Sequence, residues 1–333
     1  MIKFAYRKFK LLYMKKTKSA IAFLIIVSIL GASCSQKTDK NEKLIIFHAG
    51  SLSVPFKQMK DEFEKENPGV EVLLESAGSV QCARKITDLK KDCDIMASAD
   101  YKVIDEMLIP DFTNWNIKFA GNEMAIVFHD QSKYAGEINT ENWYEILLRD
   151  DVFFGRSDPN SDPCGYRTVL ISQLAQEYYK IPGLSEIIIS KNNEYIRPKE
   201  VDLLALLESG TIDYLFLYRS VAQQHNLNYL VLPDSINLKN PDLANYYKTA
   251  STNIVGKEPG TAITVNGEPM VYGITILQNA PNKELAIKFV QFILSDVGAK
   301  IMEENGQPLI TPSSSETYSF IPEKLKIFAK EIK

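Results

Sequence analysis

The chain has 333 residues, of which 38 are basic and 42 acidic, so its formal net charge is −4. Seven of the basic residues and none of the acidic ones lie within the first 34 residues, so removal of that segment would leave a net charge of about −11. So acidic a chain is not expected to bind nucleic acid or an anionic membrane surface, and any anion that it binds must be held by local dipoles. The remaining ~290 residues exceed what one hydrophobic core usually holds, which predicts two lobes.

Residues 1–34 are expected to be a targeting segment and not part of the fold. A basic head precedes an apolar run from Ala20 to Leu30, which ends in small residues and Cys34. This run of roughly 11 residues is too short for a membrane-spanning helix, which needs ~20, and suits a secretory signal. The junction GASCS resembles a bacterial lipoprotein signal, in which Cys34 would become the acylated first residue. Plain secretion is the alternative, because that pattern prefers a leucine three residues before the cysteine and Leu30 lies four before it.

The segment that follows is polar, and we expect residues 35–42 to be a tether between the anchor and the fold. The sequence leaves open whether Met1 or Met14 is the true start. The three other cysteines are Cys82, Cys93 and Cys164, and their spacing matches neither a zinc motif nor a redox motif. Each is expected to be a buried small hydrophobic side chain. A disulfide between the first two is the less favoured alternative.

Strands and helices are expected to alternate in the first part of the fold. The predicted strands lie at residues 44–47, 70–74 and 93–96, each followed by a polar turn and a helix. Strand–turn–helix repeats of this length predict a parallel sheet by the crossover rule. Ligands of such sheets bind beyond the carboxyl ends of the strands. Ser51, Ser79 and Asp100 lie at those ends.

The second half of the chain alternates less regularly. Its predicted strands lie at residues 122–129, 151–155, 214–218 and 269–277, and its predicted helices at residues 140–149, 166–179, 200–208, 283–294 and 296–304. Asn266-Gly267 is expected to be a hairpin turn that leads into the last strand. The pattern as a whole predicts an α/β fold.

The segment FGRSDPNSDPCGYR, residues 154–167, is the strongest local indication of a binding site. Its two Asp-Pro pairs restrict the backbone, and Asp162 or Ser161 can cap the following helix with Pro163 in its first turn. Such a turn directs free N–H groups and the positive end of the helix at one small volume. A single turn of this kind more often only caps a helix and binds no ligand. Together with the Gly50-Ser51 and Gly78-Ser79 turns, it favours anion binding.

Enzyme motifs are missing from the sequence. There is no Walker loop and no Gly-x-Ser-x-Gly nucleophile turn, and His48, His129 and His225 are too few and too scattered to indicate a metal cluster. Taken alone, Tyr218 is a strand-end aromatic residue and Glu200 a solvated helix residue, so neither by itself indicates a ligand.

Several motifs jointly resemble the archaeal-type molybdate/tungstate-binding family of ABC transporters, over residues 43–312. These motifs are HAGSL at 48–52, GS at 78–79, SADY at 98–101, NWYEIL at 142–147, DPCGYR at 162–167, ESG at 208–210, DYLFLY at 213–218 and VYGITI at 271–276. The resemblance implies a two-lobe periplasmic-binding-protein fold of type II with two hinge-crossing strands, and no enzymatic activity. Lobe 1 is expected at residues 43–122 plus 268–333, and lobe 2 at residues 123–267.

The resemblance also implies which residues contact the anion. The expected contacts are Gly50, Ser51, Ser79, Asp162, Pro163, Cys164, Glu200 and Tyr218. Asp162 and Glu200 are expected to bind the molybdenum or tungsten of the anion, and Asp202 is the alternative to Glu200. No cofactor is implied.

The two expected carboxylates conflict with simple electrostatics, because two acids beside a dianion cost several kcal/mol of repulsion. In the family, the metal centre accepts one oxygen from each carboxylate and expands from tetrahedral to distorted octahedral coordination. Sulfur in sulfate cannot expand in this way, so the same acids that attract molybdate would repel sulfate. Serine and backbone N–H donors would offset the charge on the oxo groups.

These observations lead to a functional hypothesis. The protein is expected to be a monomeric, lipid-anchored, extracytoplasmic receptor that delivers molybdate or tungstate to the membrane subunits of an ABC permease. A receptor for sulfate or phosphate is one alternative, and an enzyme that acts on a phosphorylated substrate is another. The sequence does not rank molybdate against tungstate.

The lipid anchor can be tested with the substitution Cys34→Ala. Without the acylated thiol, the protein should leave the membrane fraction or remain unprocessed, as measured by membrane fractionation and mass spectrometry. Continued membrane attachment at an unchanged processed mass would contradict the lipoprotein interpretation.

Overall fold

The computed structural model describes residues 42–256, 258 and 260–332, and residues Glu42–Lys333 form one compact unit. The predicted signal segment, Cys34 and nearly all of the predicted tether lie outside the described residues. Within the described part of the chain, no helix is long and apolar enough to cross a membrane.

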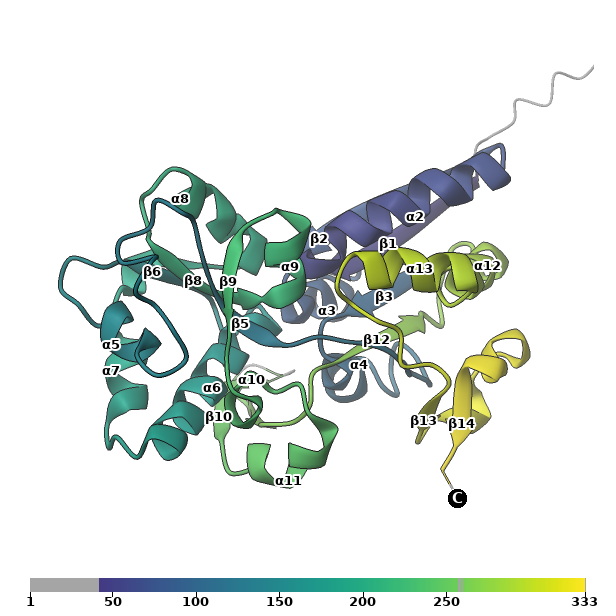
Figure 1. Cartoon of the computed structure of the whole chain (residues 1–333). Helices are drawn as coiled ribbons and strands as arrows, with labels where there is room; N and C mark the ends of the chain where they lie inside the picture. The colour runs from purple at the N-terminus through teal and green to yellow at the C-terminus, as the bar shows by residue number, and fades with distance from the viewer. Residues whose placement is uncertain (1–41, 257, 259, 333) are drawn as a thin grey trace, which may run out of the picture. The chain divides into compact units, whose positions relative to one another are not determined.

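The first of two five-stranded sheets is mixed (Figure 1). In order, its strands are β2 (Val70–Ala77), β1 (Glu42–Ala49), β3 (Ile95–Ser98), β12 (Val271–Ile276) and β4 (Ile117–Gly121). The strand β1 is parallel to both β2 and β3, as predicted, whereas β12 is antiparallel to β3 and β4. The side chains of Ile46, Ile95 and Ile274 are fully buried, because strands at the centre of a covered sheet are apolar on both faces.

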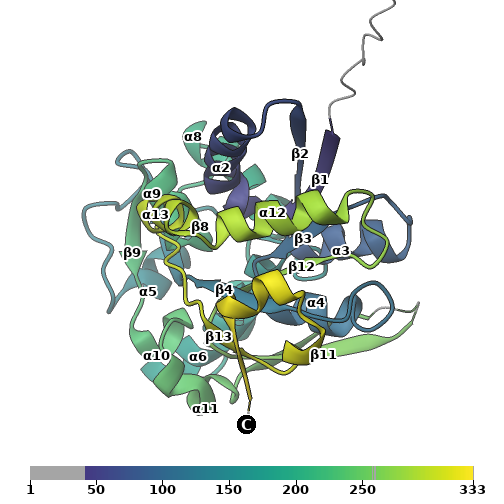
Figure 2. The same ribbon diagram turned by 90° about the vertical axis from the view of Figure 1, so that its right-hand side faces the viewer.

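Helices pack in two groups beside this sheet (Figure 2). One group contains α2 (Ser53–Glu66), α12 (Lys283–Ile293) and α13 (Asp296–Glu304), and the other contains α3 (Ser79–Thr87) and α4 (Tyr101–Met107). The ring of Phe63 on α2 lies edge-on to Phe289 on α12, with centroids 4.9 Å apart. We call this sheet with its helices the first lobe.

The second sheet is also mixed. In order, its strands are β7 (Ile196–Arg197), β6 (Phe154–Ser157), β8 (Tyr214–Tyr218), β5 (Met124–Phe128) and β9 (Asn228–Val231). Its helices are α5 (Trp143–Leu147), α6 (Pro163–Tyr179), α7 (Leu184–Ser190), α8 (Leu204–Glu208), α9 (Arg219–Gln224), α10 (Asp234–Asn237) and α11 (Ala244–Tyr247). The helix α6 packs on β5, β6 and β8 and buries Leu170, Ile171 and Leu174. We call this sheet with its helices the second lobe.

The chain passes between the two sheets twice. It leaves the first sheet after Gly121 and enters the second at Met124, and it returns to the first sheet at Val271. This confirms the predicted α/β fold with two lobes. The lobe boundaries expected from the sequence remain a prediction.

The expected hairpin turn at Asn266-Gly267 is wrong. The strand β11 (Ala262–Asn266) pairs with β10 (Ser251–Val255), whereas β12 pairs with β3 and β4. Neither Asn266 nor Gly267 has the positive φ that a type I′ turn requires. A side chain at Gly267 would lie 2.1 Å from the Tyr247 carbonyl oxygen, so this glycine permits a close approach of two backbone segments.

Most predicted elements are present with shifted ends. The predicted helix at residues 140–149 is shorter, at Trp143–Leu147, and the one at 200–208 begins as a 3-10 helix at Glu200–Leu203. The helix α3 ends at Thr87, and Leu89, which follows it, is 65% exposed. The sequence pattern did not reveal α7, the β10–β11 pair or the parallel C-terminal pair β13 (Ser313–Ser315) and β14 (Ala329–Glu331).

The three cysteines of the described residues are free and buried, as predicted. Burial raises the pKa of the Cys82 thiol to about 12 and also raises the pKa of Cys93 and Cys164. These thiols are therefore protonated and behave as small hydrophobic groups.

The two lobes meet at Gly78, and this contact can be tested. A side chain there would lie 2.2 Å from the Ser161 carbonyl oxygen of the second lobe, and the Gln81 amide donates to the same oxygen at 3.1 Å. The backbone angles of Gly78, φ −59° and ψ 142°, suit any residue. Gly78→Ala should therefore leave the stability of the protein nearly unchanged but hold the lobes apart, with a larger radius of gyration by small-angle X-ray scattering.

The matched control is Gly136→Ala, because a side chain at Gly136 meets no atom within 4 Å. Scattering curves that are the same for Gly78→Ala and the wild type would show that this contact does not limit lobe closure.

Candidate functional site

The two Gly-Ser turns lie at the same edge of the first sheet. The strand β1 ends at Ala49, immediately before a 3-10 helix at Gly50–Leu52, and β2 ends at Ala77, two residues before Ser79 begins α3. Because β1 and β2 are adjacent and parallel, their carboxyl ends bring Ser51 and Ser79 to one side. Both side chains are fully buried.

Asp162 caps the helix that begins the second-lobe part of the site. One of its carboxylate oxygens accepts the Cys164 amide at 3.1 Å, and the other accepts the Glu200 amide at 2.9 Å. The sequence left open whether Asp162 or Ser161 is the cap, and Asp162 is. Pro163 occupies the first turn of α6. The amide of Cys164 is therefore engaged by Asp162, and its thiol lies 3.6 Å from the Phe216 carbonyl oxygen.

Glu200 lies opposite the first Gly-Ser turn. A side chain at Gly50 would lie 2.7 and 2.8 Å from the two carboxyl oxygens of Glu200, so these oxygens face the first lobe. Both are buried, and neither has a hydrogen-bond partner within the described residues. The alternative residue, Asp202, has a side chain that is 44% exposed and pairs with Lys199 at 3.3 Å.

Tyr218 ends β8 and is fully buried. Its hydroxyl accepts a hydrogen bond from Arg167 Nη1 at 3.1 Å. Burial raises the pKa of Tyr218 well above its usual range, so the phenol is neutral and keeps its proton. Arg167 also donates to the carbonyl oxygen of Ala99 at 2.9 Å, and the Ala99 amide in turn donates to Ser79 Oγ at 3.0 Å.

The structure thus brings the expected residues into one region between the lobes. Glu200 faces Gly50 of the first lobe. Asp162 contacts Glu200 and lies near Gly78. Tyr218 is linked to Ser79 by hydrogen bonds through Arg167 and Ala99. The role of these residues as anion contacts remains a prediction.

Polar residues behind the Ser51 hydroxyl were not predicted. The Tyr272 hydroxyl donates to Ser51 Oγ at 2.9 Å, and it accepts hydrogen bonds from Asn122 at 2.8 Å and Gln307 at 3.1 Å. Tyr272 belongs to the motif VYGITI, but that motif reads as an ordinary apolar strand. Asn122 and Gln307 carried no signal in the sequence, because their partner is distant along the chain.

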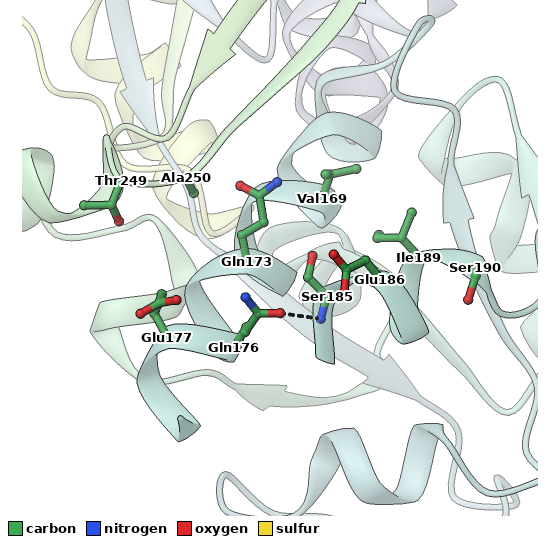
Figure 3. A pocket seen from close by; sticks show the side chains of 10 residues that line it. All are labelled: Val169, Gln173, Gln176, Glu177, Ser185, Glu186, Ile189, Ser190, Thr249 and Ala250. Atoms are coloured by element: carbon green, nitrogen blue, oxygen red, sulfur yellow. Dashed lines mark hydrogen bonds between the residues drawn. The ribbon is translucent and has the colours of Figure 1, made fainter. Parts of the chain in front are cut away.

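A cavity of about 600 Å³ lies elsewhere, beside α6 and α7 (Figure 3). It is lined by residues such as Gln173, Gln176, Glu177 and Glu186 and includes none of the predicted contact residues. Within the described part of the chain, no group of three or more His, Cys, Asp or Glu side chains could hold a metal ion. The buried region between the lobes is therefore the better candidate site.

The carboxyl pair of this site has shifted protonation equilibria. Burial raises the pKa of Asp162, while the hydrogen bonds that its carboxylate accepts from the Cys164 and Glu200 amides oppose the shift. Burial and the neighbouring negative charge of Asp162 both act to raise the pKa of Glu200, well above its usual range. Both effects favour the protonated form of Glu200 in the ligand-free protein and oppose the accumulation of two negative charges on the pair.

The raised pKa of Glu200 predicts a pH-dependent stability. The folded state retains a proton that the unfolded chain releases, so the free energy of unfolding should fall as pH rises from about 4.5 toward the folded pKa. Glutamine cannot titrate, so in Glu200→Gln the fall in the free energy of unfolding between pH 4.5 and pH 7.5 should be smaller than in the wild type. Urea denaturation at pH 4.5, 6 and 7.5 measures the effect.

The control for this measurement is Asp202→Asn, which neutralises a nearby exposed carboxylate and should change little. Equal pH dependence in the wild type and in Glu200→Gln would show that Glu200 is ionised in the folded protein.

Comparisons with known proteins agree with this fold. The family of bacterial extracellular solute-binding proteins matches residues 44–307. An uncharacterised solute-binding protein of Petrotoga mobilis is 48% identical over 92% of this chain and 96% of its own length. The molybdate/tungstate-binding protein WtpA of Pyrococcus abyssi is 44% identical over 94% and 97% of the two chains, and that of Thermococcus kodakarensis is 42% identical over 94% and 96%.

Solved structures show the same fold at low sequence identity. The periplasmic molybdate-binding protein of Azotobacter vinelandii has a TM-score of 0.57 and 15% identity, over 80% of this chain and 98% of its own. The sulfate-binding protein SubI of Mycobacterium tuberculosis H37Rv has a TM-score of 0.57 and 12% identity, over 87% and 94%. Combined with the sequence matches over nearly the full length, these results show that the chain belongs to the bacterial extracellular solute-binding proteins, a family that is not enzymatic.

Proposed function

We propose that the protein captures molybdate or tungstate outside the cytoplasm and delivers it to the membrane permease of an ABC transporter. Two relatives that are more than 40% identical over nearly the whole chain are named molybdate/tungstate-binding proteins. The observation that carries the proposal is the buried Glu200 carboxyl beside Asp162, because both of its oxygens lack a hydrogen-bond partner within the described residues. Such a group is costly unless a ligand uses it.

A metal oxyanion supplies a partner for these oxygens. Burial favours the protonated form of Glu200 in the empty site, and coordination by the metal centre would displace that proton, since metal ligands bind in their deprotonated form. Molybdenum and tungsten can accept two additional oxygen ligands, one from Asp162 and one from Glu200. The sulfur of sulfate cannot accept such ligands, so no coordination would offset the charge repulsion between sulfate and the two acids.

The oxo groups of the anion would accept hydrogen bonds from the hydroxyls of Ser51, Ser79 and Tyr218. Hydrogen bonds to an ionised acceptor are roughly twice as strong as neutral ones, which suits a protein that cannot rely on its net charge to attract an anion. Gly50, Pro163 and Cys164 line the proposed site, but the Cys164 amide donates to Asp162 and Pro163 has no amide hydrogen to offer the anion.

The remaining parts of the proposal concern transport. Residues 43–122 with 268–333 form one lobe and residues 123–267 the other, and they close over the anion. The acylated Cys34 holds this monomeric receptor at the membrane, where the ABC permease accepts the anion.

The carboxyl pair gives the decisive test of the proposed function. Asp162→Asn and Glu200→Gln should each weaken the binding of molybdate and tungstate by ~2–4 kcal/mol, roughly 30- to 1000-fold in Kd, because each removes a ligand from a desolvated site. The same substitutions should relax the exclusion of sulfate, because they remove negative charge. Titration calorimetry of the wild type and both variants with all three anions measures these changes.

The control is again Asp202→Asn, which should bind like the wild type. X-ray absorption at the molybdenum or tungsten edge checks the coordination directly. A bound centre with four short oxo bonds and no longer oxygen neighbours would exclude both carboxylates as ligands. Sulfate binding by the wild type as tight as molybdate binding would overturn the proposal.

A further inference from the structure

A buried arginine joins the two lobes next to the candidate site. Arg167 lies on α6 of the second lobe and is only 3% exposed. Its Nη2 lies 3.1 Å from a carboxylate oxygen of Asp100, which is also buried. Asp100 follows β3 of the first lobe and caps α4. The hydroxyl of Tyr166 donates to the same Asp100 oxygen at 2.7 Å. This ion pair crosses from one lobe to the other, so it forms only when the lobes are together.

The contact of Arg167 with Tyr218 determines the direction of a hydrogen bond. A guanidinium has donors and no acceptor, so the Tyr218 oxygen accepts from Arg167 Nη1 at 3.1 Å. The hydrogen of the Tyr218 hydroxyl is therefore not used in this contact. In a fully buried residue, a hydroxyl held in this way can offer its hydrogen to a bound anion.

The same arginine connects to a hydroxyl of the first lobe. Arg167 donates to the Ala99 carbonyl oxygen at 2.9 Å, and the Ala99 amide donates to Ser79 Oγ at 3.0 Å. Ser79 Oγ is thus also an acceptor in a fixed contact, which leaves its own hydrogen available. The Arg167 side chain therefore supports one hydroxyl donor on each lobe, Tyr218 on the second and Ser79 on the first.

Arg167 does not supply the positive charge for the anion. Its guanidinium is paired with the Asp100 carboxylate, and two buried opposite charges in contact largely cancel at a distance. Its effect on a ligand would act through the orientation of Tyr218 and through the contact between the lobes.

We propose that Arg167 is a positioning residue of the anion site, which holds Tyr218 as a hydrogen-bond donor and couples this orientation to lobe closure through Asp100. The inference rests on the proposed function. If Arg167 acts partly through Tyr218, then removing Arg167 should weaken binding less once the Tyr218 hydroxyl is gone.

A double-mutant cycle tests the first half of the inference. Titration calorimetry with tungstate is carried out on the wild type, Arg167→Met, Tyr218→Phe and the double variant. Each single substitution should raise Kd at least ~10-fold, as expected for loss of a hydrogen bond to a charged group. The double variant should bind at least ~3-fold more tightly than the product of the two single losses predicts, because the part of the Arg167 effect that acts through Tyr218 is already lost. The parts that act through Ala99 and Asp100 persist. Losses that multiply in full in the double variant would show that Arg167 does not act through Tyr218 and would overturn this half of the inference.

The control is Arg156→Met, which removes another buried arginine of the second lobe. Arg156 donates to the Ile189 carbonyl and to Asn193 and not to Tyr218, so its effect should multiply with that of Tyr218→Phe. Arg167→Met leaves Asp100 buried without its partner; if that variant does not fold, the cycle is run with Asp100→Asn/Arg167→Met in its place.

Asp100→Asn tests the coupling to closure. Without the ion pair between the lobes, tungstate should leave roughly tenfold faster while its association rate changes little, as measured by stopped flow. An unchanged release rate would confine the action of Arg167 to its own lobe and overturn this half of the inference. If the wild type binds neither molybdate nor tungstate, the proposed function is wrong. If the wild type binds tungstate and the losses in the double variant multiply, only the inference about Arg167 is wrong.

Discussion

The burial of two adjacent carboxyl groups, Asp162 and Glu200, is the constraint on which the rest of the structure depends. Desolvation alone opposes their ionisation, so the fold must hold them where a ligand can use them. The helix cap at the start of α6 places Asp162, and its second oxygen fixes the backbone of Glu200. Two α/β lobes, each with its own sheet and covering helices, supply the packing that offsets this cost.

The parts of the fold that follow from local rules could be predicted from the sequence. The strand Tyr214–Tyr218 and the helix Asp296–Glu304 have the predicted bounds, because their apolar patterns are bounded by clear polar turns. A helix cap at Ser161 or Asp162 follows from the Asp-Pro pair, and the structure shows that Asp162 is the cap. The parallel arrangement of β1 with β2 and β3 follows from the strand–turn–helix repeats.

Long-range contacts could not be predicted, for physical reasons. The hydroxyls of Ser51 and Tyr272 meet although 221 positions separate them along the chain, and nothing in a strand pattern says which strand will lie beside it. Arg167 ends the motif DPCGYR, yet its ion-pair partner is Asp100 of the other lobe, which no local pattern indicates. The turn at Asn266-Gly267 failed for the same reason, because the close approach of Tyr247 decides the backbone there.

The three buried cysteines have a practical consequence. Maleimide dyes react with thiolates, and thiols held protonated inside a packed core react slowly. Cysteines introduced at an exposed position of each lobe could therefore be labelled selectively without first replacing Cys82, Cys93 or Cys164. A donor and an acceptor dye attached in this way would report opening and closing of single molecules by energy transfer, because Cys82, Cys93 and Cys164 would remain unlabelled.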